Sequence, residues 1–171
     1  MRLEDHIRDI PDFPKPGIAF KDITPLFLDA EALRFTVDAL ADYARAREVD
    51  FVVSAEARGF VLGGAVATQV GAGFILARKP GKLPRETASF EYQLEYGVDA
   101  LEVHADAMRG GARVLVHDDL LATGGTAGAL CGLVEQAGGV VAGCAFVIEL
   151  AFLSGRNRLR GYDVHSLVVY H

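Results

Sequence analysis

VLVHDDLLATGGT, at residues 114–126, is the stretch that decides the fold. Its first four residues predict a strand, because their pattern is that of a buried one. Two adjacent carboxylates, Asp118 and Asp119, then end the strand, and after a short loop the sequence TGGT at 123–126 opens a helix. In an open α/β sheet, ligands bind beyond the carboxyl ends of the strands. The acid pair and the glycine turn are therefore expected at one binding edge.

The residue types of this stretch suit a phosphorylated sugar. Glycines and threonines at a helix N-terminus present backbone N–H groups and hydroxyls to an anion, and the helix dipole favours negative charge there. Carboxylates do not hold phosphate, but they accept hydrogen bonds from the vicinal hydroxyls of a sugar. The stretch therefore predicts a ribose 5-phosphate site. Other phosphate-binding patterns fail, since there is no G-x-x-x-x-G-K-[ST] and Leu76 stands where a dinucleotide pattern from Gly71 requires glycine.

Strands and helices alternate on both sides of this stretch. Helices are predicted at 29–46, after residue 60 to about residue 70, and at 125–137. Strands are predicted at 51–54, 73–77, 114–117, 140–150 and 164–170, with a basic turn or short helix at 154–160. This alternation predicts an α/β fold whose mostly parallel sheet of about five strands is flanked by helices.

Two segments do not fit the alternation. Residues 1–28 carry four of the six prolines and are expected to form a short N-terminal hood over the sheet. Residues 85–98 have alternating aromatics and predict a hairpin or a mobile flap, and residues 80–97, with glycine and proline at one end and Gly97 at the other, suit a flexible lid. Residues 1–171 are expected to fold as a single domain, with little left over for a regulatory one.

Composition narrows the classes of protein. With 51% hydrophobic and 23% charged residues, the chain is expected to be globular rather than disordered. Its net charge of −6 argues against nucleic acid as a partner, so an anionic ligand needs a local cluster of cations. No run approaches the ~20 apolar residues of a membrane span, and the first residues lack the apolar core of a signal peptide. We therefore expect a cytoplasmic protein, with Cys131 and Cys144 buried and reduced.

The motifs together resemble a known family. Residues 114–126 closely resemble the 5-phosphoribosyl 1-diphosphate signature of the type I phosphoribosyltransferases, and the ending ATGGT resembles their adenine-specific branch. Four further stretches match in order: PGIAFKDITP at 16–25, EARGF at 56–60, RKPGKLP at 78–84 and LEYG at 94–97. The resemblance therefore covers nearly the whole chain.

The resemblance implies an activity and its partners. Enzymes of this branch transfer phosphoribose from 5-phosphoribosyl 1-diphosphate to adenine, giving AMP and pyrophosphate in purine salvage. They use Mg²⁺ and work as homodimers. In this chain Mg²⁺ would be held mainly by the substrate, because the five histidines share no ligand spacing and no side-chain metal site is expected.

The resemblance also implies roles for individual residues. Asp118 and Asp119 would contact the ribose hydroxyls, and Glu95 would be the acid/base carboxylate. The 5′-phosphate would lie on Ala122, Thr123, Gly124, Gly125 and Thr126. Pyrophosphate would be bound by Arg58, Arg78, Lys79 and Lys82. Adenine would be bound by the main chain of Ala19 and Lys21 and by the ring of Phe20.

General chemistry agrees with these roles. Loss of pyrophosphate leaves an oxocarbenium-like ribosyl centre while N9 of adenine attacks and sheds a proton, which a carboxylate on a flap can help to move. Mg²⁺ and fixed cations disperse the charge of the leaving pyrophosphate. Water competes for the activated ribose, which gives a closing lid its purpose.

Three alternatives stay open. The chain could act on hypoxanthine, guanine or xanthine, because main-chain contacts select the base and the sequence does not show main-chain direction. It could be a non-catalytic regulator that senses 5-phosphoribosyl 1-diphosphate, or a structural subunit with a relic site. Single features also have ordinary explanations: Glu95 can be merely exposed, the cations of 78–85 can form a solvated loop, and His117, where the family has an aliphatic residue, can be a packed strand histidine.

Overall fold

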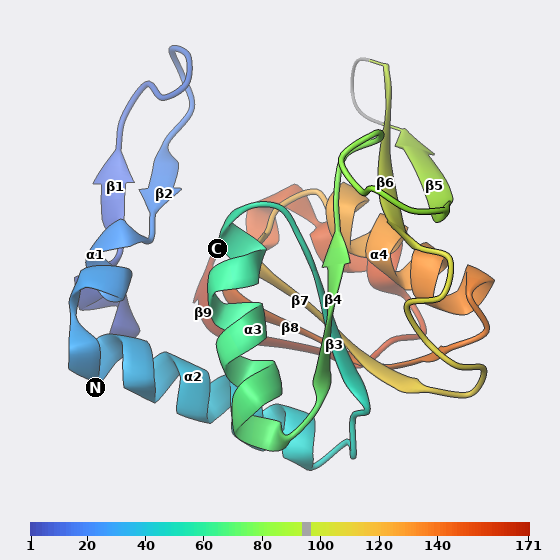
Figure 1. Ribbon diagram of the computed structural model, residues 1–171. Coiled ribbons are helices and arrows are strands. Elements are labelled where there is room, and N and C mark those ends of the chain that lie inside the picture. Colours follow the sequence, from blue (N-terminus) through green and yellow to red (C-terminus); the bar gives the residue numbers. More distant parts are fainter. Residues whose placement is uncertain (94–96) are drawn as a thin grey trace.

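The computed structural model describes residues 1–93 and 97–171, which form an α/β fold around one parallel sheet (Figure 1). The sheet has five strands in the order β4-β3-β7-β8-β9, and each neighbouring pair is parallel. Their bounds are β3 Phe51–Ala55, β4 Gly73–Ala77, β7 Arg113–Leu121, β8 Val140–Leu150 and β9 Val164–Tyr170. The expected fold class is confirmed.

Helices cover both faces of the sheet and create two apolar cores. On one face lie α1 (Thr24–Leu28), α2 (Ala30–Arg45) and α3 (Arg58–Val70), and on the other lies α4 (Gly125–Gln136). Val52 of β3 packs in the first core and its neighbour Val53 in the second, because successive strand residues point to opposite faces. None of the helices described is both long enough and apolar enough to cross a membrane.

Helix α2 shows how local sequence sets an element. Asp29 precedes its first residue, and Oδ1 of that carboxylate accepts hydrogen bonds from the N–H groups of Glu31 and Ala32, each at 2.9 Å. Such a cap satisfies donors that have no partner within the helix. The helix then buries one stripe that includes Val37 and Leu40. The predicted helix at 29–46 is confirmed to within one residue at each end.

Strand β7 is longer than the sequence predicts. The prediction that a strand at 114–117 ends at the acid pair is wrong, since β7 continues to Leu121. The cause is the neighbouring strand, because β8 extends as far and keeps pairing with β7 up to that residue. Asp118 and Asp119 therefore lie within the sheet, near its carboxyl end, and not in a loop behind it.

Two β-hairpins stand outside the sheet. After a 3₁₀ turn, η1 (Leu3–His6), the first pairs β1 (Arg8–Ile10) with β2 (Phe20–Asp22), and the second pairs β5 (Thr87–Gln93) with β6 (Val98–His104). Both stand at the upper end of the molecule in Figure 1, the end toward which β4 points. The first hairpin belongs to the segment expected as a hood. The second hairpin supports the hairpin alternative for the segment with alternating aromatics.

Hairpin β5–β6 packs closely on α4. A Cβ on Gly132 of α4 would lie 2.4 Å from the ring of Phe90, so a larger residue there would push β5 away. Two residues along the same face of β5, the ring of Tyr92 lies 3.5 Å from the position of a Cβ on Gly125. Glycines on the helix therefore set how near the hairpin can come.

Two short 3₁₀ turns connect β8 to β9. The turns are η2 (Ala151–Leu153) and η3 (Gly155–Leu159), where the sequence predicts a basic turn or short helix.

Two cysteines lie in the core beside α4. Cys131 of α4 and Cys144 of β8 are buried and free, with their sulfur atoms 3.7 Å apart. The contact with Cys144, and then burial, raise the pKa of the Cys131 thiol. The expectation that both cysteines are buried is confirmed.

Candidate functional site

The acid pair of β7 lies against the N-terminus of α3. Arg58, the first residue of α3, has its Nε 2.8 Å from Oδ2 of the buried Asp119. The next residue must be small, because a Cβ on Gly59 would lie 2.8 Å from Oδ1 of Asp118. Helix α3 thus brings a cation predicted to bind pyrophosphate onto the acids predicted to bind ribose.

Desolvation changes the electrostatics of the acid pair. Burial, and then the charge of the adjacent Asp119, raise the pKa of Asp118 well above its usual range. The guanidinium of Arg58 lowers that pKa, but by less than those two effects raise it. Because a second negative charge at this pair is unfavourable, hydroxyl donors or a metal cation bound there would stabilise the fully ionised pair.

The phosphate loop, as we call residues 122–126, connects β7 to α4. With Leu120, Leu121 and Ala127 it lines a cavity of about 70 Å³. Gly124 has a φ of 82°, in the left-handed region, and a Cβ there would lie 2.4 Å from the carbonyl oxygen of Gly155. The first N–H groups of an α-helix have no partner within the helix, so α4 offers donors at this loop. The loop can therefore hold an anion without any charged side chain.

The basic segment, as we call residues 78–85, follows β4 and is held by carboxylates. Oε1 of Glu56 accepts a hydrogen bond from the main-chain N–H of Lys79 at 2.7 Å and lies 3.2 Å from Nε of Arg78. These two contacts, the main-chain one first, lower the pKa of Glu56. The ammonium of Lys79 pairs in turn with Asp99 of β6, and this hydrogen bond lowers the pKa of Asp99. Arg78 and Lys79 of this segment therefore already have carboxylate partners.

Phe20 connects hairpin β1–β2 to the acid pair. The centroid of its ring lies 5.3 Å from Cζ of Arg58, and the ring of Phe13 packs edge-on against it with centroids 5.2 Å apart. The side chain of Lys21 is engaged elsewhere, with Nζ 3.8 Å from the centroid of the Tyr170 ring. Lys21 can therefore offer its main chain to a ligand, which is the role that the resemblance implies.

The structure joins the predicted residues into two neighbouring sets. Contacts link Phe20, Arg58 and the acid pair, and the phosphate loop follows on the same strand. The basic segment is linked through Glu56, two residues before Arg58. Lys82 and Ala19 are exposed. Glu95, with residues 94 and 96, lies outside the described residues.

Four residues at this site escape sequence patterns: Glu56, Tyr92, Asp99 and Arg158. Glu56 begins the EARGF stretch, so it could have been singled out there as a carboxylate near predicted cations. The hydroxyl of Tyr92 donates to Oδ2 of Asp99 at 3.2 Å, a contact that depends on the register of the hairpin. Nη1 of Arg158 donates to the carbonyl oxygen of Gln93 at 3.2 Å, across 65 residues of sequence. No local signal marks that contact.

Known proteins resemble the chain along its whole length. A family model described as phosphoribosyl transferase domain matches residues 28–167. A curated adenine phosphoribosyltransferase from Rubrobacter xylanophilus is 61% identical over 170 residues, which are 99% of this chain and 92% of that protein. The solved adenine phosphoribosyltransferase of Thermoanaerobacter pseudethanolicus has a TM-score of 0.95 and 52% identity, covering 99% of this chain and 100% of its own. The Saccharomyces cerevisiae enzyme, solved with adenine and an imino-altritol bisphosphate, has a TM-score of 0.92 and 37% identity, with 96% of each chain covered.

Proposed function

The chain belongs to the phosphoribosyltransferase family, in its adenine-specific branch, and we propose how its residues divide the work of the reaction. It transfers the 5-phosphoribosyl group of 5-phosphoribosyl 1-diphosphate to adenine, giving AMP and pyrophosphate in purine salvage. The bond from C1′ to the pyrophosphate oxygen breaks, the bond from C1′ to N9 of adenine forms, and N9 loses its proton.

The succession of an acid pair and an uncharged loop on one strand supports the assignment of the ribose 5-phosphate. The carboxylates of Asp118 and Asp119 accept hydrogen bonds from the ribose hydroxyls. The 5′-phosphate lies on Ala122, Thr123, Gly124, Gly125 and Thr126, where the start of α4 supplies N–H donors and the positive end of its dipole. Both ends of the sugar phosphate are thus bound by one strand and the helix that follows it.

The pyrophosphate is assigned to the cations around Glu56, namely Arg58, Arg78, Lys79 and Lys82. Arg58 and Lys79 are paired with Asp119 and Asp99, so pyrophosphate binding exchanges these carboxylates for phosphate oxygens. Fixed cations stabilise the charge that develops on this group as it leaves.

Adenine is assigned to hairpin β1–β2. The ring of Phe20 stacks on the base, and the main chain of Ala19 and Lys21 reads its polar edge. The contact between Phe20 and Arg58 supports this position, because it puts the base next to the acids that hold the ribose. N9 of adenine then lies on the side of C1′ that pyrophosphate does not occupy.

Mg²⁺ is assigned to the oxygens of the substrate, beside the acid pair. Within residues 1–93 and 97–171, no three His, Cys, Asp or Glu side chains cluster as metal ligands. The carboxylates of Asp118 and Asp119 are oxygen ligands, the type that a hard divalent cation prefers, and the charge of the ion would favour their ionised form. When bound, the ion neutralises charge on the leaving pyrophosphate.

Residues 80–97 act as the lid, and Glu95 supplies the acid/base carboxylate. The lid segment begins in the basic segment and includes β5, which packs on α4. Its closure excludes the water that would otherwise react with the ribosyl centre. The carboxylate of Glu95 accepts the proton that N9 loses.

A homodimer in the cytoplasm completes the proposal. β4 is an edge strand of the sheet, with Leu76 43% exposed, and on the adjacent α3 Val61 is 50% exposed. Edge strands with apolar side chains favour pairing with another chain, so we place the contact between two copies on this side. The free thiols of Cys131 and Cys144 fit a reducing compartment.

Steady-state turnover with four purines tests the base and the metal. With 5-phosphoribosyl 1-diphosphate and Mg²⁺, adenine is expected to give a higher kcat/KM than hypoxanthine, guanine or xanthine. Chelation of Mg²⁺ is expected to abolish AMP formation. A better purine than adenine would overturn the assignment of the base site, and full activity without divalent metal would overturn that of Mg²⁺.

Two variants test the acid roles. Glu95→Gln and Asp119→Asn are each expected to lower kcat/KM about 100-fold, since one loses the proton acceptor and the other a ribose-binding charge. Glu91→Gln, an exposed glutamate on the same hairpin, is the matched control and is expected to retain activity. Unchanged turnover in Glu95→Gln would remove Glu95 from the chemistry, and unchanged turnover in Asp119→Asn would remove Asp119.

A further inference from the structure

Arg158, in the turn between β8 and β9, contacts two parts of the site that the reaction uses separately. We propose that Arg158 is a positioning residue that couples the phosphate loop to hairpin β5–β6, a coupling that rests on the roles proposed above for that loop and that hairpin. A 5′-phosphate bound at the loop then favours the closed lid. Neither the sequence motifs nor the roles assigned above include this residue.

The side chain of Arg158 reaches both parts at once. Its Nη1 donates a hydrogen bond to the carbonyl oxygen of Gln93, the last residue of β5, at 3.2 Å. The same nitrogen lies 3.5 Å from the position of a Cβ on Gly125, the first residue of α4. The Cβ of Arg158 lies 3.2 Å from the corresponding position on Gly124. One side chain therefore extends from the phosphate loop to the end of the strand that leads to Glu95.

Tyr92 encloses the same corner from the hairpin. Its ring lies 3.5 Å from the position of a Cβ on Gly125, opposite the strand end that Arg158 holds. Its hydroxyl donates to Oδ2 of Asp99 at 3.2 Å, and Asp99 also pairs with Lys79. A continuous set of contacts therefore runs from the proposed 5′-phosphate site to a proposed pyrophosphate-binding cation.

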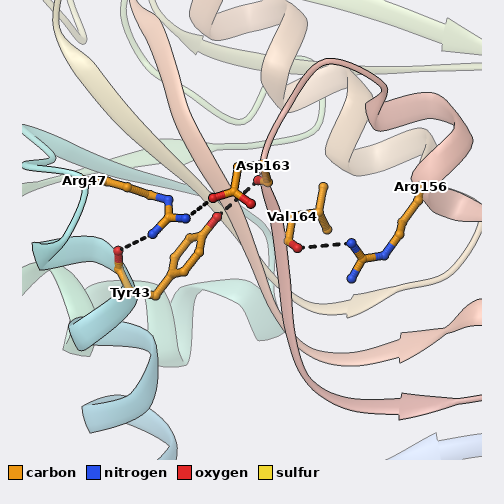
Figure 2. A network of polar contacts seen from close by, with 5 residues as sticks. All are labelled: Tyr43, Arg47, Arg156, Asp163 and Val164. Carbon is orange, nitrogen blue, oxygen red and sulfur yellow. Dashed lines mark hydrogen bonds and ion pairs between the residues drawn. The ribbon is translucent and has the colours of Figure 1, made fainter.

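The turn that carries Arg158 is fixed at both ends. Nε and Nη2 of Arg156 each lie 2.7 Å from an oxygen of the buried Glu149, and Nη1 donates to the carbonyl oxygen of Val164 at 3.1 Å. Figure 2 shows this last contact and the other end of the turn, where Asp163 is held by Tyr43 of α2 and by Arg47, which follows that helix. Because the main chain of the turn is fixed, the side chain of Arg158 is the part that can respond to a ligand.

The charges at the phosphate loop determine whether a bound phosphate strengthens or weakens the contact between Arg158 and hairpin β5–β6. The phosphate loop has no charged side chain, so a phosphate dianion in its cavity attracts the adjacent guanidinium of Arg158. A guanidinium has five N–H donors, enough to bind phosphate oxygens and the carbonyl oxygen of Gln93 together. A filled cavity therefore strengthens the contact that holds β5. By linkage, the closed hairpin strengthens phosphate binding by the same factor.

Ribose 5-phosphate is the probe that isolates this coupling, because it carries the sugar and the 5′-phosphate without base or pyrophosphate. Amide hydrogen exchange of the full chain is measured with and without a saturating concentration of the probe. In the wild-type protein, peptides from residues 122–136 and from 87–93 are both expected to gain protection. In Arg158→Ala, 122–136 still gains protection, whereas the gain at 87–93 falls about tenfold, the loss of one charged hydrogen bond.

Two further variants separate coupling from folding. Arg158→Lys keeps a cation and is expected to restore part of the protection at 87–93. Arg160→Ala is the matched control, because Arg160 is exposed on the same turn and its contact is with Asn157, at 3.4 Å. It is expected to behave as wild type. In steady state, Arg158→Ala should raise KM for 5-phosphoribosyl 1-diphosphate about tenfold and change kcat less.

The outcomes distinguish a failure of this coupling from a failure of the proposed site. If the probe gives no protection at 122–136 in the wild-type protein, the phosphate loop is not the 5′-phosphate site, and the coupling falls with it. If 122–136 is protected but 87–93 is unchanged in the wild-type protein, the site stands and the coupling is wrong. Equal protection at 87–93 in wild type and Arg158→Ala also overturns the role of Arg158.

Discussion

The phosphate loop and the basic segment both bind phosphate groups in the proposed reaction, yet they are built in opposite ways. The loop has no charged side chain and is fixed by its main chain, with Gly124 at a φ of 82° against Gly155. The basic segment has four cations, and three of them pair with the carboxylates of Glu56, Asp99 and Asp106. The loop holds the phosphate that stays on the product AMP, whereas the segment holds the group that leaves. The cations of the basic segment can pair with these carboxylates again when pyrophosphate leaves. This arrangement suits a group that must be released.

The largest effect is expected from a substitution in the phosphate loop, the region that is fixed by its main chain. Gly124→Ala forces a side chain into the left-handed region and 2.4 Å from the carbonyl oxygen of Gly155. Strain and steric overlap together should lower the free energy of unfolding by about 4 kcal/mol. Binding of ribose 5-phosphate should weaken by more than about 100-fold, which is about 2.7 kcal/mol. Denaturant unfolding and calorimetric titration measure the two quantities.

Gly128→Ala is the control for that variant. Gly128 lies one turn later in α4, and the first atom that a Cβ there would meet outside the helix is 3.9 Å away. Alanine is a better helix former than glycine, so stability should rise by about 0.5–1 kcal/mol. Equal losses in the two variants would show that α4 as a whole, and not the turn at Gly124, is sensitive.

The second largest effect is expected from His117 on β7, the strand that precedes the phosphate loop. It tests whether this part of the strand is shielded from water. His117 is fully buried, its Nδ1 lies 2.9 Å from the carbonyl oxygen of Ala145, and burial lowers the pKa of His117 to about 4. Since the unfolded chain has a histidine pKa of about 6.5, the stability from neutral His117 is fully present above pH 6.5. It is lost as the pH falls toward 4, by about 3 kcal/mol.

Comparison with His117→Leu isolates this loss. The other titrating groups are common to both proteins, so the difference between their unfolding free energies at pH 7 and at pH 4.5 reports the histidine. The variant should lose less stability on acidification. Parallel curves for the two proteins would mean that His117 is not desolvated in the folded state.

A third, smaller effect is expected on substrate binding by the basic segment, whose cations exchange carboxylate partners for phosphate oxygens. Lys79→Ala removes a cation from the basic segment and should raise KM for 5-phosphoribosyl 1-diphosphate about tenfold. Asp99→Asn removes the carboxylate that pairs with Lys79, so pyrophosphate should inhibit the variant about two- to threefold more strongly. Inhibition constants from steady-state kinetics check this. Weaker inhibition in Asp99→Asn would show that Asp99 orients Lys79 and does not compete for it.

The smallest effect is the expected difference between the basic segment and the phosphate loop in how ligand binding depends on salt. Raising ionic strength from about 0.05 to 0.5 M shortens the Debye length and screens the exposed cations of the basic segment. KM for 5-phosphoribosyl 1-diphosphate should rise about threefold, whereas Kd for ribose 5-phosphate should change by less than about twofold. Equal changes in both constants would remove the distinction between the loop and the segment.

The turn and the helix at residues 122–136 could be predicted from the sequence because their requirements are local. The glycines of TGGT, the strand before them and the helix after them are contiguous, and each has its own chemical reason. The end of β7 was predicted wrongly because strand length depends on the partner, and β8 lies beyond α4 in the sequence. Local patterns show which residues can start or end an element, but not how far a neighbouring strand will extend it.

The contacts around Gly125 could not be predicted for a related reason. Tyr92, Asp99 and Arg158 contact one another or the loop only through the register of hairpin β5–β6 and the path of the turn after β8. Neither is encoded in a spacing that can be read along the chain. The resemblance to a family supplied the remaining roles, including that of Glu95, for which the local sequence gives no physical reason.

The two sulfur atoms beside α4 have a practical consequence. Cys131 and Cys144 lie 3.7 Å apart in the core that joins α4 to β8. Thiol reagents attack the thiolate, which burial and the raised pKa of Cys131 keep scarce in the folded protein. Alkylation must therefore wait until the helix separates from the strand. The labelling rate then measures how often the native core opens, in a chain that needs no added reporter group.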